Sequence, residues 1–183
     1  YNYTTVYGSA VMPVSLGAGG SNTSGGGAIK LNISGALNVD GTLSANGDDR
    51  SSGTCYTGAG GSIWIVAEEL SGSGEISARG GNCLGSGAGG SGGMITVTCN
   101  TNSFAISDIY AYGGVTATST RHGAAGSVFL QNFSQLADLT GNLYINNSDI
   151  QTDVYVYTDL LGSTGISDIV NLIGGFPEED GHP

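Results

Sequence analysis

The stretch that decides the fold is GAGGSIWIVAEELSGSGEISARGG, which runs from Gly58 to Gly81. Glycines lie at both ends, and the apolar residues form short alternating groups such as SIWIVA. A period of two is typical of a half-buried β-strand. Comparable groups occur elsewhere in the chain as AIKLNI, MITVTC and SVFLQN. We therefore expect the 34 glycines of this 183-residue chain to separate strands rather than to form a flexible linker.

These groups recur at a nearly constant spacing. The glycines that precede them are separated by 34, 32 and 33 residues and are Gly27, Gly61, Gly93 and Gly126. The residues two and four positions later are aliphatic in every copy: Ile29 and Leu31, Ile63 and Ile65, Ile95 and Val97, Val128 and Leu130. Two further columns are Leu37, Leu70, Phe104 and Leu136, and then Leu43–Ala45, Ile76–Ala78, Ile109–Ala111 and Leu143–Ile145. The chain thus contains a repeat of about 33 residues, seen four times.

A repeat of this kind predicts a solenoid, because one unit cannot bury its apolar face without its neighbours. The period of two and the scarcity of Glu, Lys and Gln favour stacked strands over helices. We therefore predict an all-β fold, a parallel β-helix or β-solenoid of about four repeats over residues 17–148. Clusters such as GAGGS at 58–62 are expected at its corners, where positive φ or close backbone approach is required. The intervening positions should face outward: Lys30, Trp64, Thr96 and Phe129.

The pattern GGSIxIxA…LSGSGxISAxGG is similar to the glycine-rich parallel β-helix repeats of large secreted and surface-attached proteins, including adhesin-like and fibre-forming ones. The similarity covers roughly residues 17–147 and implies the same β-helical fold. For function it implies three alternatives, because this scaffold carries structural fibres, adhesins and polysaccharide-cleaving enzymes.

The two ends of the chain do not follow the repeat. Residues 1–16 and 149–183 include apolar, Tyr-rich, strand-like stretches, and the second segment ends in a polar tail. A solenoid end leaves unpaired strand edges that usually receive a polar cap. We expect these segments to pair with other copies of the chain, with 1–16 as a strand donor to the neighbouring subunit. Different contact surfaces at the two ends would give a head-to-tail polymer.

Charge and composition exclude some partners. The formal net charge is −11, and the fixed cations number only four, which argues against nucleic acid and against an anionic membrane surface. No apolar run has the length of a membrane span. Since the sequence does not begin with Met, we expect a chain released by cleavage or internal to a longer precursor.

Cysteines and sequons both indicate an extracellular location. Cys55 and Cys83 fall in the glycine-rich corners of successive repeats and are expected to form a disulfide, whereas Cys99 is in phase with the inward residues and should be a buried thiol. The sequence offers five N-glycosylation sequons: Asn2, Asn22, Asn32, Asn132 and Asn146. Asn22 lies in an expected corner loop and Asn32 at an outward position of the repeat, so both should be accessible. Asn132 falls at an inward position of the repeat.

The residue types of an active site are scarce. His122 and His182 are sixty positions apart, and no cluster of His, Cys or Asp has the spacing of a zinc site. The best local candidate for catalysis is GDD at residues 47–49 beside Arg50, and we favour a solvated turn there. Asp40, Asp48 and Asp49 could hold calcium, but the GGxGxD motif of calcium-binding β-rolls does not occur. We therefore predict no enzyme activity, no cofactor and no metal. The favoured function is a glycosylated extracellular filament or surface-layer subunit, followed by a glycan-binding adhesin that uses Trp64 and Tyr112, and then by a polysaccharide lyase or hydrolase.

Overall fold

The computed structural model describes residues 8–117, 121–137 and 140–148, and the backbone of residues 169–173. This part of the chain is built from short β-strands and one 3₁₀ turn, η1 (Ile106–Asp108). The strands are β1 (Ala28–Asn32), β2 (Ala36–Asn38), β3 (Thr42–Ser44), β4 (Thr54–Tyr56), β5 (Ser62–Val66), β6 (Glu69–Ser71), β7 (Glu75–Ser77), β8 (Ser86–Ala88), β9 (Met94–Thr98), β10 (Thr101–Asn102), β11 (Ile109–Tyr110), β12 (Ser127–Gln131), β13 (Gly141–Tyr144) and β14 (Ile169–Ile173).

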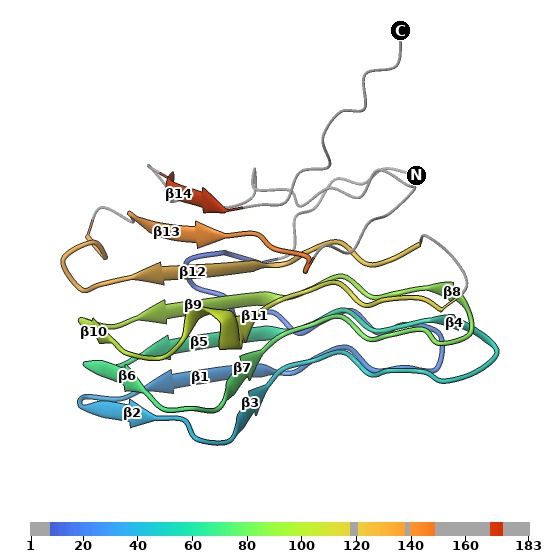
Figure 1. Cartoon of the computed structure of the whole chain (residues 1–183), viewed down its shortest axis with the longest axis horizontal. Coiled ribbons are helices and arrows are strands. Elements are labelled where there is room, and N and C mark those ends of the chain that lie inside the picture. Colours follow the sequence, from blue (N-terminus) through green and yellow to red (C-terminus); the bar gives the residue numbers. More distant parts are fainter. Residues whose placement is uncertain (1–7, 118–120, 138–139, 149–168, 174–183) are drawn as a thin grey trace, which may run out of the picture.

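The described strands stack into a parallel β-solenoid, which confirms the predicted fold class (Figure 1). Each turn contributes one strand to each of three sheets. The sheets have the orders β1-β5-β9-β12-β13-β14, β2-β6-β10 and β3-β7-β11, and β4 pairs with β8 in a fourth. The register follows the sequence repeat, since Ile29 pairs with Ile63 and Ile63 with Ile95. The inward side chains form one continuous core in which Ile63, Ile65 and Ile76 are fully buried.

The solenoid completes about three turns, one fewer than the four repeats of the sequence. β12 continues the first sheet in parallel with β9, as the repeat predicts. The chain then turns back, and β13 pairs antiparallel with β12, so that Leu143 lies opposite Phe129. The predicted equivalence of Leu143–Ile145 with Ile109–Ala111 is therefore wrong. Leu136 is likewise not in the inner column, because its side chain is 43% exposed.

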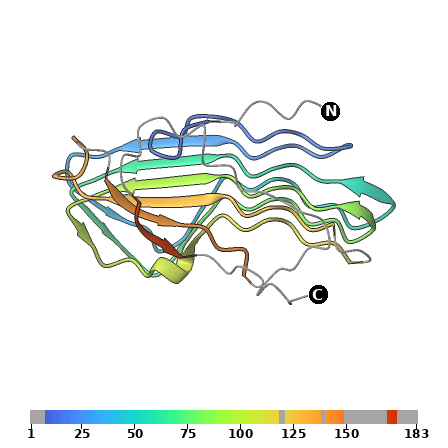
Figure 2. The same cartoon turned by 90° about the horizontal axis from the view of Figure 1, so that it is seen from above.

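The glycine-rich parts form a flat extension of the solenoid, here called the glycine slab. Its two layers are residues 24–27, 57–61, 89–93 and 123–126, and residues 45–50, 78–83 and 111–116. Seen from above, they run as long adjacent segments from the sheets to the tip at β4 and β8 (Figure 2). Hydrogen bonds cross between the layers: the N–H of Gly81 donates to Gly58 O at 2.9 Å, and that of Gly90 donates to Gly81 O at 3.0 Å.

The slab backbone has a period of three instead of the two of a strand. Consecutive N–H groups of Ala59, Gly60 and Gly61 donate to three different segments, at Ala18 O, Ser91 O and Ala45 O. Three residues per turn is the period of the polyproline II helix, which has no internal hydrogen bonds and leaves every N–H for a neighbour. At Gly58, Gly60 and Gly61 a Cβ would lie within 2.1 Å of a backbone atom of a neighbouring segment, so these positions have no room for a side chain.

Close approach, and not positive φ, explains the glycine clusters. The described glycines with positive φ are Gly8, Gly53 and Gly72, and none of them lies in a GAGG cluster. A Cβ on Gly60, by contrast, would lie 2.1 Å from Ala78 O. The sequence left two explanations for the glycine clusters open, positive φ and close backbone approach. The structure shows close approach, and it places the clusters in flat layers instead of at corners.

Polar side chains tie successive turns together at the same 33-residue spacing. Asn46 Oδ1 accepts a hydrogen bond from the N–H of Arg79 at 2.7 Å, and Asn82 Oδ1 accepts one from Val115 at 2.9 Å. Thr57 Oγ1 accepts from the N–H of Gly90 at 2.9 Å. Each bond satisfies a backbone donor in the next turn, so these residues stabilise the stacking itself.

Candidate assembly surface

The N-terminal end of the solenoid is an open turn. The inner side chains of the first turn are only partly buried, and they are Ile29, Leu31, Ile33, Leu37, Val39 and Leu43. Their counterparts one turn later, Ile65, Leu70 and Ile76, are fully buried. The difference arises because, among the described residues, the second turn has a neighbouring turn on both sides and the first turn has one on a single side. Apolar core side chains are thus partly accessible at this end, here called the open turn. It is the turn formed by β1, β2 and β3 (Figure 1).

The strand edges of the open turn are also available. Among the described strands, β1, β2 and β3 each pair on one side, with β5, β6 and β7. The backbone groups on the other side can bind a further strand. The open turn therefore offers both an apolar surface and hydrogen-bonding edges.

The C-terminal end has a different shape. Because β13 turns back along β12, no described strand lies on the far edge of β11. A hollow of about 210 Å³ opens there, here called the tyrosine hollow. Its lining includes Ile109, Tyr110, Tyr112, Val128, Tyr144 and Asn146. The rings of Tyr110 and Tyr112 are stacked, with centroids 4.7 Å apart.

Residues 8–16, the described part of the predicted 1–16 assembly segment, lie on the outer face of their own first sheet. Ser62 Oγ donates to Ser15 O at 2.6 Å, and Thr96 Oγ1 donates to Ala10 O. Val11 packs on Phe129 and Leu143 in a second small apolar cluster. Thr96 and Phe129, which were predicted to face outward, are therefore buried beneath this segment. Residues 1–7 lie outside the described part.

The outward aromatic residues do not form one row. Trp64 lies in β5 of the first sheet, and the Nζ of Lys30 is 3.7 Å from the centroid of its ring. Tyr112 follows β11 of the third sheet and lines the tyrosine hollow. Thr96 and Phe129 occupy the same outward column as Trp64, but residues 8–16 cover both of them. The two aromatic residues considered for glycan binding thus lie on separate surfaces.

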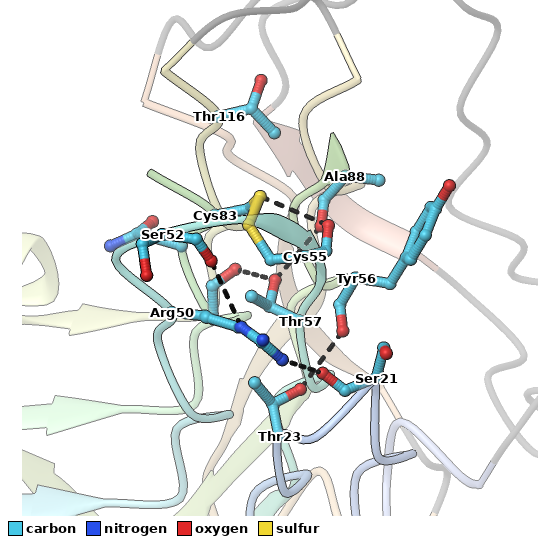
Figure 3. Close-up of a disulfide and its surroundings, with 12 residues drawn as sticks. Ser21, Thr23, Arg50, Ser52, Cys55, Tyr56, Thr57, Cys83, Ala88 and Thr116 are labelled. Carbon is cyan, nitrogen blue, oxygen red and sulfur yellow. Dashed lines mark hydrogen bonds between the residues drawn. A yellow bond between two sulfur atoms is a disulfide. The ribbon is translucent and has the colours of Figure 1, made fainter. Parts of the chain in front are cut away.

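The tip of the glycine slab carries a disulfide between Cys55 and Cys83, with their Cα atoms 5.7 Å apart (Figure 3). Cys55 belongs to β4 and pairs with Gly87, whereas Cys83 lies in the other layer and forms bridges with Arg50 and Thr116. The disulfide therefore links two successive turns of the solenoid and also links the two sides of the glycine slab at its tip. Arg50 Nη1 donates to Ser21 O at 2.9 Å beside it. Cys99 is a free, buried cysteine.

The sequons differ in accessibility. Asn22, Asn32 and Asn146 are exposed. Asn132 is half-buried directly after β12, and its Oδ1 accepts hydrogen bonds from Ser134 and Gln135. Asn2 lies outside the described residues.

The carboxylates considered for catalysis or calcium take part in contacts between turns or between the two layers of the glycine slab. Asp49 forms an ion pair with Arg79 at 2.7 Å, and the hydrogen bond from that guanidinium lowers the pKa of the Asp49 carboxyl. Asp40 accepts a hydrogen bond from the N–H of Ser73 at 3.1 Å, and Asp48 accepts one from Ser24 at 3.0 Å. In the described residues, no three His, Cys, Asp or Glu side chains lie together in a group that could hold a metal ion.

Tyr110 provides a measurable signal from the edge of the tyrosine hollow. Burial, together with a hydrogen bond and the negative charge of Glu75, raises the pKa of Tyr110 to about 12. A raised pKa of the folded state means that this contribution to stability is complete below pH 10, the ordinary tyrosine value, and is lost as the pH rises through 12. In an absorbance titration of phenolate, we expect Tyr110→Phe to remove the late-titrating step. Loss of an early step instead would contradict the placement of Tyr110.

The described part of the chain contains no helix of the length and apolarity needed to cross a bilayer. Comparison with family models, with curated proteins and with solved structures gives no match for this chain.

Proposed function

We propose that this chain is the structural subunit of a glycosylated extracellular filament or surface layer that assembles head to tail. The observation that carries the proposal is the open turn. An end of a solenoid that exposes both core side chains and strand edges is a surface for association, because solenoids that remain monomeric cover such ends with polar caps. The two ends of this solenoid differ in shape, so contact between them is heterologous, and a heterologous contact that does not close into a ring continues into a filament.

The extracellular location is supported by the disulfide and the accessible sequons. Disulfides persist in oxidising compartments and are rare in the reducing cytosol. Asn22, Asn32 and Asn146 are exposed, as acceptors of N-glycans must be.

The filament is favoured over the adhesin because of how the aromatic residues lie. Trp64 and Tyr112, the pair considered for glycan binding, lie on separate surfaces and so cannot contact one glycan together, and Lys30 covers the Trp64 ring. The polysaccharide lyase or hydrolase stays third, since Asp40, Asp48 and Asp49 already bind backbone groups or Arg79.

The test is a charge placed on the open turn. Leu37 is a half-buried inner residue of β2, and in Leu37→Lys the aliphatic stem can lie on the core while the ammonium group reaches solvent. The free subunit should therefore still fold, but stacking would bury the charge without a partner. We expect filaments seen by electron microscopy for the native chain to be absent for Leu37→Lys at the same concentration.

The matched control is Ala36→Lys, which adds the same charge one residue earlier on the exposed, outward side of β2. It should form filaments as the native chain does. Circular dichroism and melting of all three proteins verify that each is folded. Filaments of Leu37→Lys, or a native chain that stays monomeric at high concentration, would refute head-to-tail assembly through the open turn.

A further inference from the structure

Asn146 differs from the other sequons in the residue that stands two positions before it. In the segment Tyr144-Ile145-Asn146 the earlier residue is a tyrosine, whereas the corresponding residues for Asn22, Asn32 and Asn132 are Gly20, Lys30 and Leu130. Side chains two positions apart in an extended chain lie on the same side. Tyr144 and Asn146 do so here, since both line the tyrosine hollow.

The backbone around Asn146 is held in place on the other side. Asn147 Oδ1 accepts a hydrogen bond from the N–H of Gly113 at 2.7 Å, and Asn147 Nδ2 donates to Gly123 O at 3.1 Å. Asn147 therefore fixes the segment to the glycine slab, and Asn146 points away from it toward the hollow. Asn146 Oδ1 accepts a hydrogen bond from the N–H of Ser148 at 2.8 Å, and Nδ2 has no hydrogen-bond partner among the described residues.

The hollow has the size and chemistry of a site for one sugar ring. Its volume of about 210 Å³ is several times the roughly 30 Å³ of a water molecule, and is smaller than the pockets of drug-sized ligands. Tyr110, Tyr112 and Tyr144 offer aromatic faces, which bind the apolar C–H face of a pyranose, and their hydroxyl groups can bind its polar edge. A ring attached to Asn146 Nδ2 would start at the rim of this site.

We propose that Asn146 is N-glycosylated and that the first N-acetylglucosamine of its glycan occupies the tyrosine hollow, against Tyr112 and Tyr144. This inference rests on the proposed passage of the chain through a secretory pathway. There the Asn146 Nδ2 displaces a lipid-linked diphosphate from C1 of the sugar. An N–C bond forms, the C–O bond to the diphosphate breaks with its electron pair, and Nδ2 loses one proton. The sugar then covers the edge of β11 when the chain folds.

The experiment uses the full chain secreted from a eukaryotic host, with site occupancy measured by glycopeptide mass spectrometry. The folded protein is treated with an amidase that releases N-glycans, and release is followed at each sequon. We expect the glycan at Asn146 to be released at least about tenfold more slowly than the glycan at Asn22, whose side chain lies in an exposed turn. In unfolded protein the two rates should be similar.

Two variants separate a seated sugar from slow release for other reasons. Tyr112→Ala should raise the release rate at Asn146 toward that at Asn22 and leave the rate at Asn22 unchanged. Tyr56→Ala, an exposed tyrosine at the far tip of the slab, is the matched control and should leave the rate at Asn146 unchanged. In melting experiments Asn146→Gln should lower Tm by about 2–4 °C in the native chain and have no effect in Tyr112→Ala.

The outcomes distinguish this inference from the proposed function. If Asn22 and Asn32 carry glycans and Asn146 does not, or if the Asn146 glycan is released as fast as the others, the seated sugar is refuted and the glycosylated filament stands. If no sequon is occupied in the secreted chain, both the inference and the proposed glycosylation fail. Filament formation is decided separately by Leu37→Lys.

Discussion

Replacing Gly60 with alanine is expected to abolish the native packing of the glycine slab. The new Cβ would lie 2.1 Å from Ala78 O and 2.6 Å from Gly93 N, and both are backbone atoms that cannot rotate away. Gly60 also donates its N–H to Ser91 O in the next turn at 2.8 Å, so the segment cannot move outward without loss of that bond. The cost should exceed the roughly 1–3 kcal/mol of ordinary overpacking, because no flexible side chain can yield.

The matched control for this prediction is Gly27→Ala, because a Cβ on Gly27 meets nothing within 4 Å and its φ is not positive. Thermal melting and hydrogen exchange should show a folded Gly27→Ala and a strongly destabilised or unfolded Gly60→Ala. Equal stability of the two variants would show that the two layers of the slab do not pack as described.

Removal of the disulfide is the second change with a large expected effect. The bond between Cys55 and Cys83 closes a separation of 28 residues, and the chain-entropy relation gives about 3–4 kcal/mol for a loop of this length. The double variant Cys55→Ala, Cys83→Ala should therefore unfold at a Tm lower by about 7–14 °C. Reduction of the native chain should lower its Tm by a similar amount.

The control for the disulfide is Cys99→Ala, which removes a buried thiol that is not in a bridge. It should retain the sensitivity of the native chain to reductant, whereas the double variant should lose it. A native chain whose melting does not respond to reductant would contradict the bridge, and a free Cys55 in peptide mapping would contradict its pairing.

The periodic part of the fold could be predicted because its cause is local. Alternating apolar residues such as Ile63 and Ile65 recur after about 33 positions. Each set needs the matching set of a neighbouring turn to be buried, whatever the rest of the chain does. The registers Ile29–Ile63 and Ile63–Ile95 follow from that spacing alone. Glycine clusters indicated close approach or positive φ, but the choice between the two depends on what lies opposite, as at Gly60 and Ala78 O.

The path of the chain in the last repeat could not be predicted from the spacing. Leu143 occupies the position that the pattern assigns to the next turn, yet it lies opposite Phe129 in an antiparallel pair. An alternating strand can bury its apolar side against either neighbour, so the pattern alone does not choose between continuing the solenoid and turning back. The chain turns back where Leu143 can pack on the outer face of the first sheet. There Val11, from a segment outside the repeat, joins Phe129 and Leu143 in one apolar cluster.

The sequence by itself determined the strand period, the length of one turn and the stacking of these turns into an all-β solenoid, because these depend on spacing along the chain. Only the tertiary structure decided the number of complete turns, the flat glycine slab and the burial of Thr96 and Phe129 under residues 8–16. It also brought Tyr112 of the third turn beside Tyr144 and Asn146. These features depend on contacts between distant segments of different composition, which no repeat encodes.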